Sequence, residues 1–147
     1  MKSILRISLI LMVGSLPAWA ALGGDISSVN ADAQVLGGQH SVVAKGGYTL
    51  HQITKADGSA VNEFVSPAGV VFGISWQGHF MPNLNQVLGS HLTDLQQGER
   101  THVVPRRAVT IQTDDFVFTS FGHGHSFRGR AYVRSLVPGN LTPEVVQ

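Results

Sequence analysis

EFVSPAGVVFGISWQGHFMPNLNQVLG, the stretch from Glu63 to Gly89, decides the fold of this chain. It holds two short apolar runs, Glu63–Val65 and Val70–Trp76, on either side of Ser66-Pro67-Ala68-Gly69. Proline in the second position and glycine in the fourth favour a type I turn between two strands. Pro82 then opens a helix-like pattern. The stretch therefore predicts a hairpin, a crossover and a helix in succession.

The run Val70–Trp76 is the most apolar strand expected in the chain. Alternation puts its bulky side chains on one face, which we expect to be core, and its small ones on the other. The bulky set is Val70, Phe72, Ile74 and Trp76, and the small set is Val71, Gly73 and Ser75. The small face leaves room for a segment packed closely against it.

The segment Asn83–Gln97 carries the clearest helical pattern. Its apolar stripe repeats at three- and four-residue intervals through Leu84, Val87, Leu88, His91, Leu92 and Leu95. Pro82 suits the start of a helix and Gly98 its end. Gly89 lies inside and costs about 1 kcal/mol relative to alanine. Because only one face is apolar, we expect this helix to lie on a sheet.

Five more strands complete the predicted sheet. They are Tyr48–Thr54, Val61–Ser66, Ala108–Thr113, Phe116–Phe121 and Phe127–Ser135. Asp57-Gly58 predicts a hairpin, and Glu99–Pro105 is expected to be a connector. Three strands, a helix and three strands predict an α+β domain at residues 48–135, with an antiparallel sheet of about six strands and one main amphipathic helix packed on it.

The segments flanking this domain are predicted to be less regular. Residues 21–47 form a Gly-rich arm or a short helix, which Asp25 or Ser27 would cap and Gly37 would end. The glycine pairs there match no phosphate-binding pattern. Pro138-Gly139 and Pro143 predict an irregular, frayed tail at residues 136–147.

The first twenty residues read as a signal peptide. Lys2 and Arg6 are basic, Ile7–Leu16 is apolar and too short to span a bilayer, and Ala18-Trp19-Ala20 places small residues at the cleavage site. We expect cleavage between Ala20 and Ala21, and a periplasmic or secreted product. No later apolar run reaches membrane length.

The composition of the remaining 127 residues (147 − 20) excludes several classes of protein. The chain has no cysteine and hence no disulfide. Removing Lys2 and Arg6 leaves 8 basic against 9 acidic residues, a net charge of −1, so no basic excess points to nucleic acid. No cofactor-binding motif is present.

Three stretches carry a resemblance to a known family. At YTLHQI (48–53), EFVSPAGVVFGISWQG (63–78) and MPNLNQVLG (81–89), the chain resembles a family of exported Gram-negative bacterial proteins, a domain of unknown function. The resemblance implies a small secreted or periplasmic domain. It brings no activity, cofactor or catalytic residue to any position of this chain.

Histidine is the unusual count, with seven residues. His123-Gly124-His125 is the one local pair, and its glycine lets both imidazoles reach one ion. With no cysteine, further metal ligands would come from His79, His102, Asp114 or Asp115. A polar hairpin loop is the plainer interpretation of the same residues.

Arg128, Arg130 and Arg134 alternate along the last predicted strand, opposite Phe127, Gly129, Ala131 and Val133. Such a basic stripe suits an acidic glycan, a lipid headgroup or a partner protein. Its alternative role is a solvated outer face that discourages edge pairing.

These observations leave three readings of function. The leading one is a non-enzymatic binding or envelope-associated module, with an envelope protein or glycan as its partner. The alternative is a histidine-based metal-binding protein using His123 and His125. A small hydrolase has the least support, because no catalytic motif is present and nothing ranks Ser66, Ser75 or Ser90 as a nucleophile.

Overall fold

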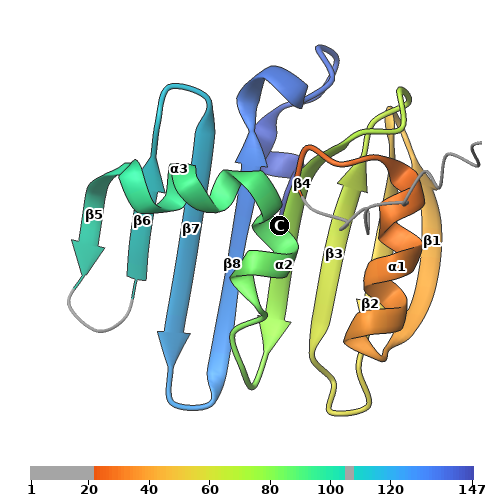
Figure 1. Cartoon of the computed structure of the whole chain (residues 1–147), viewed down its shortest axis with the longest axis horizontal. Helices are drawn as coiled ribbons and strands as arrows, with labels where there is room; N and C mark the ends of the chain where they lie inside the picture. Colours follow the sequence, from red (N-terminus) through yellow and green to blue (C-terminus); the bar gives the residue numbers. More distant parts are fainter. Residues whose placement is uncertain (1–21, 105–107) are drawn as a thin grey trace, which may run out of the picture.

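The protein is one broad antiparallel sheet with its helices on one face (Figure 1), as seen in a computed structural model that describes residues 22–104 and 108–147. The predicted signal peptide, residues 1–20, and the cleavage site before Ala21 lie outside these residues. The α+β class and the antiparallel sheet are confirmed. Among the described residues, no helix is long and apolar enough to cross a membrane.

Two consecutive four-stranded meanders build the sheet. Its strand order is β1-β2-β3-β4-β8-β7-β6-β5, so the last strand of each meander meets the other at the centre. The strands are β1 Gln39–Lys45, β2 Tyr48–Thr54, β3 Ala60–Val65, β4 Val71–Gly78, β5 Glu99–Val104, β6 Ala108–Gln112, β7 Phe116–His123 and β8 Ser126–Val133. Each meander follows a helical segment, so the two halves of the chain repeat one order of elements.

The prediction of about six strands was wrong, since the sheet formed by the described residues has eight. The two missed strands, β1 and β5, form its edges. In β1 six of seven residues are exposed. The strand therefore lacks the alternation of apolar and polar residues that indicates a strand in a sequence. The expected connector Glu99–Pro105 holds β5, which pairs with β6 through its backbone.

The helices confirm most of the capping signals. The helix α1, Ile26–Leu36, begins at Asp25, whose carboxylate accepts from the Ser27 amide at 2.7 Å, and ends at Gly37 with φ of 64°. The predicted helix 83–97 is interrupted at its glycine. It divides into α2 Leu84–Leu88, the 3₁₀ turn η1 Gly89–His91 and α3 Leu92–Gln97, because Gly89 has φ of 52°.

A β-bulge in β4 changes which residues share a face. Phe64 pairs with Gly73 and Val65 with Val71, so Phe72 is the extra residue. The prediction that Phe72 shares a face with Ile74 and Trp76 was therefore wrong. Phe72 lies on the opposite face, fully buried against Phe64 and Val146.

The helix face holds the larger apolar core. Buried residues of β3, β4, β7 and β8, among them Ile74, Trp76 and Phe118, pack there with Val29 of α1 and with Val87 and Leu88 of α2. We call the opposite side of the sheet the far face. It carries a smaller apolar cluster of Phe64, Phe72 and Val146, with Tyr48, Leu50 and Tyr132 packed around it.

The C-terminal segment is ordered, which corrects the prediction of a frayed tail. It contains the 3₁₀ turns η2 Arg134–Leu136 and η3 Pro143–Val145, and it crosses the end of the sheet onto the far face (Figure 1). Val146 is fully buried, and its Cγ2 lies 2.5 Å from where a Cβ on Gly73 would be. The small side of β4 thus receives the end of the chain.

Candidate binding site on the far face

The far face is divided into a covered half and an open half. The covered half is apolar, and the C-terminal segment packs on it through Val137, Leu141, Val145 and Val146. The open half begins where the side chains of the sheet become polar. Ser75 marks the boundary, because its hydroxyl donates to the backbone oxygen of Gln147 at 2.9 Å.

A row of polar side chains crosses the open half from strand to strand. Gln52 donates to Asn62 at 3.0 Å, and Asn62 donates to Ser75 at 3.2 Å. The strand register continues the row, since Ser75 pairs with Arg130 and Arg130 with Thr119. Neighbouring strands lie about 4.8 Å apart. The row therefore presents amide, hydroxyl and guanidinium groups at a regular spacing.

The two arginines of this half differ in their partners. Arg130 donates to the backbone oxygen of Val146 at 3.0 Å and lies over the ring of Tyr132. Glu144 is an acidic neighbour of Arg130. A hydrogen bond from Thr142 lowers the pKa of Glu144, and the positive charge of Arg130 lowers it further. Arg128 is exposed, and within the described part of the chain its side chain makes no hydrogen bond or ion pair.

A hollow of about 480 Å³ lies over these residues. Its polar walls come from Asn62, Ser75, Gln77, Thr119, Arg128, Arg130 and Gln147, and Phe121 provides an aromatic wall. Phe121 is 40% exposed and sits opposite Arg128 in the register of β7 and β8. We call this hollow the arginine groove.

Arg134 does not belong to the groove. The strand β8 ends at Val133, so Arg134 falls in η2 and leaves the alternation expected from the sequence. Its guanidinium donates to the backbone oxygens of Thr113 and Asp114 at 2.8 and 2.6 Å. Arg134 thus ties η2 to the turn between β6 and β7.

The histidine pair lies at the tip of the β7–β8 hairpin. Gly124, with φ of 59°, makes the turn between His123 and His125. His79 approaches this tip, with Nδ1 3.1 Å from the backbone oxygen of His125. Nowhere in the described ranges do three or more histidine, cysteine, aspartate or glutamate side chains gather in a way that could hold a metal ion. The geometry gives the metal-binding reading no support.

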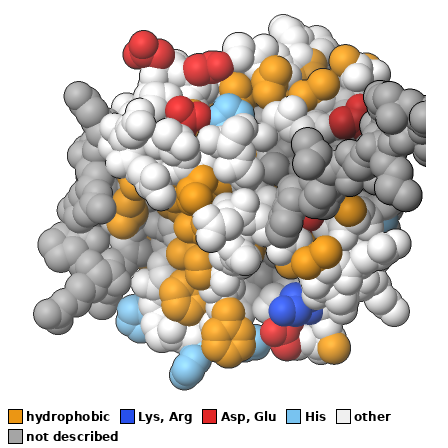
Figure 2. Space-filling model, in the orientation of Figure 1, with side chains coloured by type: hydrophobic (Ala, Val, Ile, Leu, Met, Phe, Trp, Pro, Cys, Tyr) orange, Lys and Arg blue, Asp and Glu red, His pale blue; other side chains and the backbone are white. Residues whose placement is uncertain are grey.

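A second hollow, of about 230 Å³, lies on the helix face between the end of α1 and the segment after β4. It is lined by exposed apolar side chains, including Val35, Phe80 and Met81. Figure 2 shows apolar side chains gathered along this side of the molecule, with histidines near its lower edge. Its polar lining residues are Lys55, Asp57, Ser59, Gln77 and Asn83, so a cation and a carboxylate of the same turn both face it.

A buried polar cluster, which no sequence pattern indicated, joins three elements under α1. Asp32 of α1, Glu63 of β3 and Gln86 of α2 are each no more than 5% exposed. Gln86 donates to Asp32 at 3.2 Å, and Asp32 and Glu63 share a hydrogen bond. Burial, followed by the charge of Asp32, raises the pKa of Glu63 to about 9.

His51 extends this cluster toward the edge of the sheet. It pairs with Glu63 across β2 and β3, and its Nδ1 lies 3.1 Å from Nε2 of His40 on β1. Burial lowers the pKa of His51, and the neighbouring His40 lowers it further. The cluster is closed to solvent, so its chemistry is that of a packed interior and not of a substrate site.

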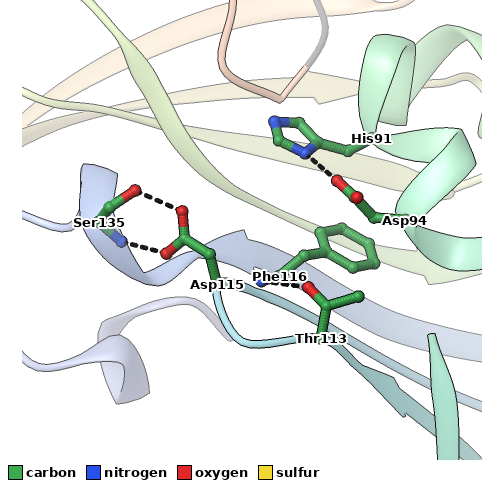
Figure 3. A network of polar contacts seen from close by, with 6 residues as sticks. All are labelled: His91, Asp94, Thr113, Asp115, Phe116 and Ser135. Atoms are coloured by element: carbon green, nitrogen blue, oxygen red, sulfur yellow. Dashed lines mark hydrogen bonds and ion pairs between the residues drawn. The ribbon is translucent and has the colours of Figure 1, made fainter. Parts of the chain in front are cut away.

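A second polar network fastens the helices to the β6–β7 turn (Figure 3). Nδ1 of His91 lies 2.6 Å from a carboxylate oxygen of Asp94, and the His91 ring stacks on Phe116. Below it, Ser135 donates to Asp115 through its amide at 2.7 Å and its hydroxyl at 2.5 Å. The hydroxyl is therefore engaged by a carboxylate and not by an imidazole, which is not the arrangement of a serine nucleophile.

Among the described residues, no hydrogen bond joins any of the three serines considered as nucleophiles to the side chain of a histidine, aspartate or glutamate. Ser66 lies in the predicted turn, where its hydroxyl accepts from the Val70 amide at 3.3 Å. Ser75 bonds Asn62 and Gln147 within the polar row. Ser90 lies in η1, between α2 and α3.

Fold and site together define a small antiparallel-sheet protein with a polar, ligand-sized hollow on its open face. The chain belongs to the family described as "Protein of unknown function (DUF2844)", whose model matches residues 18–146. No curated protein matches the chain, and no solved structure matches it.

Proposed function

We propose that this protein is an exported, non-enzymatic binding module whose ligand occupies the arginine groove. The observation that carries the proposal is Arg128. It is an exposed guanidinium with no protein partner in the described structure, and it lies at a hollow large enough for a small ligand. A free arginine beside ordered amides and hydroxyls is suited to an anionic ligand.

The chemistry of the groove supports binding rather than turnover. The described side chains that line it are amides, hydroxyls, guanidinium groups and aromatic rings. General acid–base catalysis needs a group that exchanges protons near neutral pH, such as an imidazole or a carboxyl group. Neither kind is among the described side chains that line this hollow.

The position of the groove also supports a binding role. Its floor is the centre of the sheet, where β4 and β8 join the two meanders. The sheet fixes the backbone of these strands, and hydrogen bonds order Asn62 and Ser75, so this part of the site is preorganised. The predicted signal peptide supports a place for such a module in the bacterial envelope or outside the cell.

Binding of a soluble polyanion tests the proposal. We expect the mature chain, residues 21–147, to bind dextran sulfate, and Arg128→Gln to weaken the dissociation constant about tenfold. That factor corresponds to about 1.4 kcal/mol, which is close to the lower bound for a charged hydrogen bond. Lys55→Gln is the matched control, because it removes the same charge from the exposed β2–β3 turn. Equal weakening by both substitutions would mean that the groove is not the site.

A further inference from the structure

We propose that the arginine groove recognises an acidic saccharide, a chain that contains carboxylated sugar units. This inference rests on the proposed binding function and narrows it to one class of ligand. Three features of the groove carry it: one free cation, a row of hydrogen-bonding groups, and an exposed aromatic ring beside them.

The charge of the groove suits a saccharide that has one negative charge on each sugar unit. Arg128 is free to make the bidentate contact that a carboxylate favours. Arg130 is held by the Val146 oxygen and lies near the carboxylate of Glu144. The carboxylate of Glu144 offsets part of the positive charge of Arg130. The groove therefore offers one full guanidinium rather than a basic field.

The polar row supplies partners for hydroxyl groups. Gln77 and Thr119 line the groove, and neither has a side-chain hydrogen bond within the described residues. Asn62 and Ser75 are already ordered by their bonds to each other and to Gln52 and Gln147. Fixed amides and hydroxyls spaced across adjacent strands match a ligand that carries hydroxyl groups along its length.

Phe121 supplies the apolar part of the site. It is 40% exposed on the far face and lies opposite Arg128 on the adjacent strand. A sugar ring has an apolar face made of its C–H groups, and an exposed aromatic ring can cover that face. Its neighbour Arg128 would then meet a carboxylate on the edge of the same sugar ring.

A membrane surface is less well matched by these residues. Anionic lipid surfaces are bound by clusters of about four to eight basic residues. The described lining of the groove contains two, and Arg130 already has an acidic neighbour. We therefore place the carboxylated sugar ahead of the lipid headgroup.

The test compares five probes by isothermal titration against the mature chain. The carboxylated sugars are oligogalacturonate and oligoalginate. Methyl-esterified oligogalacturonate removes the charge and keeps the sugar, polyglutamate keeps the carboxylates without the sugar, and vesicles of phosphatidylglycerol represent the lipid surface. We expect at least one carboxylated sugar to bind at least tenfold more tightly than its ester or polyglutamate.

Two variants locate that binding. Arg128→Gln should weaken the binding of the carboxylated sugar about tenfold. Phe121→Ala should weaken it severalfold, with no change in the binding of polyglutamate, and Lys55→Gln should have no effect. Unchanged circular-dichroism melting of each variant shows that the fold is retained.

The outcomes separate the two proposals. The saccharide class is overturned if neither sugar binds, if polyglutamate binds as tightly as the sugars, or if only the vesicles bind in an Arg128-dependent way. The groove remains the binding site in these cases as long as Arg128→Gln weakens the binding of dextran sulfate or of the vesicles. If Arg128→Gln leaves the binding of dextran sulfate and of all five probes unchanged, the proposed function itself fails, and the saccharide class fails with it.

Discussion

The carboxyl groups of Asp32 and Glu63 share a hydrogen bond in the interior of the protein, where each residue is no more than 2% exposed. Asp32 belongs to α1 and Glu63 to β3, so the pair links the first helix to the sheet. Two carboxylates side by side in a medium of low polarity repel each other. The pair therefore retains a proton that both groups would lose in water.

The first prediction is that the free energy of unfolding falls as pH rises from 7 to 9. The pKa of Glu63 is raised from 4.5 to about 9 in the folded protein, so the native state keeps a proton that the unfolded state has lost. This stabilisation is complete below pH 4.5 and disappears as pH rises toward 9. The slope approaches at most about 1.4 kcal/mol per pH unit. Urea unfolding at pH 7, 8 and 9 measures it.

Glu63→Gln is the control for this pH dependence. Glutamine keeps the size and the hydrogen bond of the side chain but cannot lose a proton, so the slope above pH 7 should nearly vanish. The window avoids His51, whose lowered pKa changes stability only at more acidic pH. A wild-type stability that stays flat from pH 7 to 9 would contradict the proton-sharing pair.

The second prediction concerns the packing of α2 on the sheet. Leu88 is fully buried, so Leu88→Ala should lower the free energy of unfolding by about 2–5 kcal/mol. Asn85 is exposed on the same helix, and Asn85→Ala should stay within about 0.5 kcal/mol. Thermal or urea unfolding compares the two, and equal losses would mean that α2 does not pack as described.

The sequence predicted those parts of the fold that depend on local chemistry. Asp57-Gly58 makes its hairpin with φ of 82° at Gly58. In the Ser66–Gly69 turn the Gly69 amide donates to the Ser66 oxygen at 2.9 Å. Turn residues act on their own neighbours, so no knowledge of tertiary structure is needed to recognise them.

The sequence could not predict features that depend on distant partners. The bulge turns Phe72 to the far face, where it packs with Phe64 and Val146. Nothing in the residues next to Glu63 distinguishes a glutamate buried against Asp32 from one in solvent, so the polar cluster was missed. Among the candidate site residues, the sequence placed Arg128 and Arg130 on one face correctly. It placed Arg134 there wrongly, because nothing local marks the end of β8 at Val133.

The third prediction tests the seating of the C-terminal segment on β4. A Cβ on Gly73 would lie 2.5 Å from Cγ2 of Val146, so Gly73→Ala should displace the segment and cost about 1–3 kcal/mol. Digestion by carboxypeptidase should then begin sooner than in the wild type. Gly139→Ala is the control, because a Cβ there has no neighbour within 4 Å. Resistance of Gly73→Ala equal to that of the control would show that the end of the chain lies elsewhere.

The fourth prediction concerns export. Ala18-Trp19-Ala20 supplies the small residues of a cleavage site after a short apolar run, so protein recovered outside the cytoplasm should begin at Ala21. N-terminal sequencing of the periplasmic and secreted fractions measures this directly. Ala20→Glu should block cleavage, because the acidic side chain does not fit a site for small residues. Recovery of a membrane-bound product that retains Met1 would contradict the signal-peptide interpretation.

The last prediction separates two arginines that the sequence grouped together. Arg128 has no protein partner in the described structure, whereas Arg134 bonds the backbone oxygens of Thr113 and Asp114. Arg128→Gln should therefore weaken the binding of an anionic ligand about tenfold and leave the melting temperature unchanged, because an exposed charge contributes little to stability. Arg134→Gln should do the reverse, with unchanged binding and a loss of about 1 kcal/mol in the free energy of unfolding from its two hydrogen bonds.

Titration and thermal melting of both variants at 50 and 300 mM salt measure the two effects, and binding to Arg128 should weaken at the higher salt. If Arg134→Gln impaired binding as strongly as Arg128→Gln, the ligand surface would have to extend past the end of β8 to the β6–β7 turn.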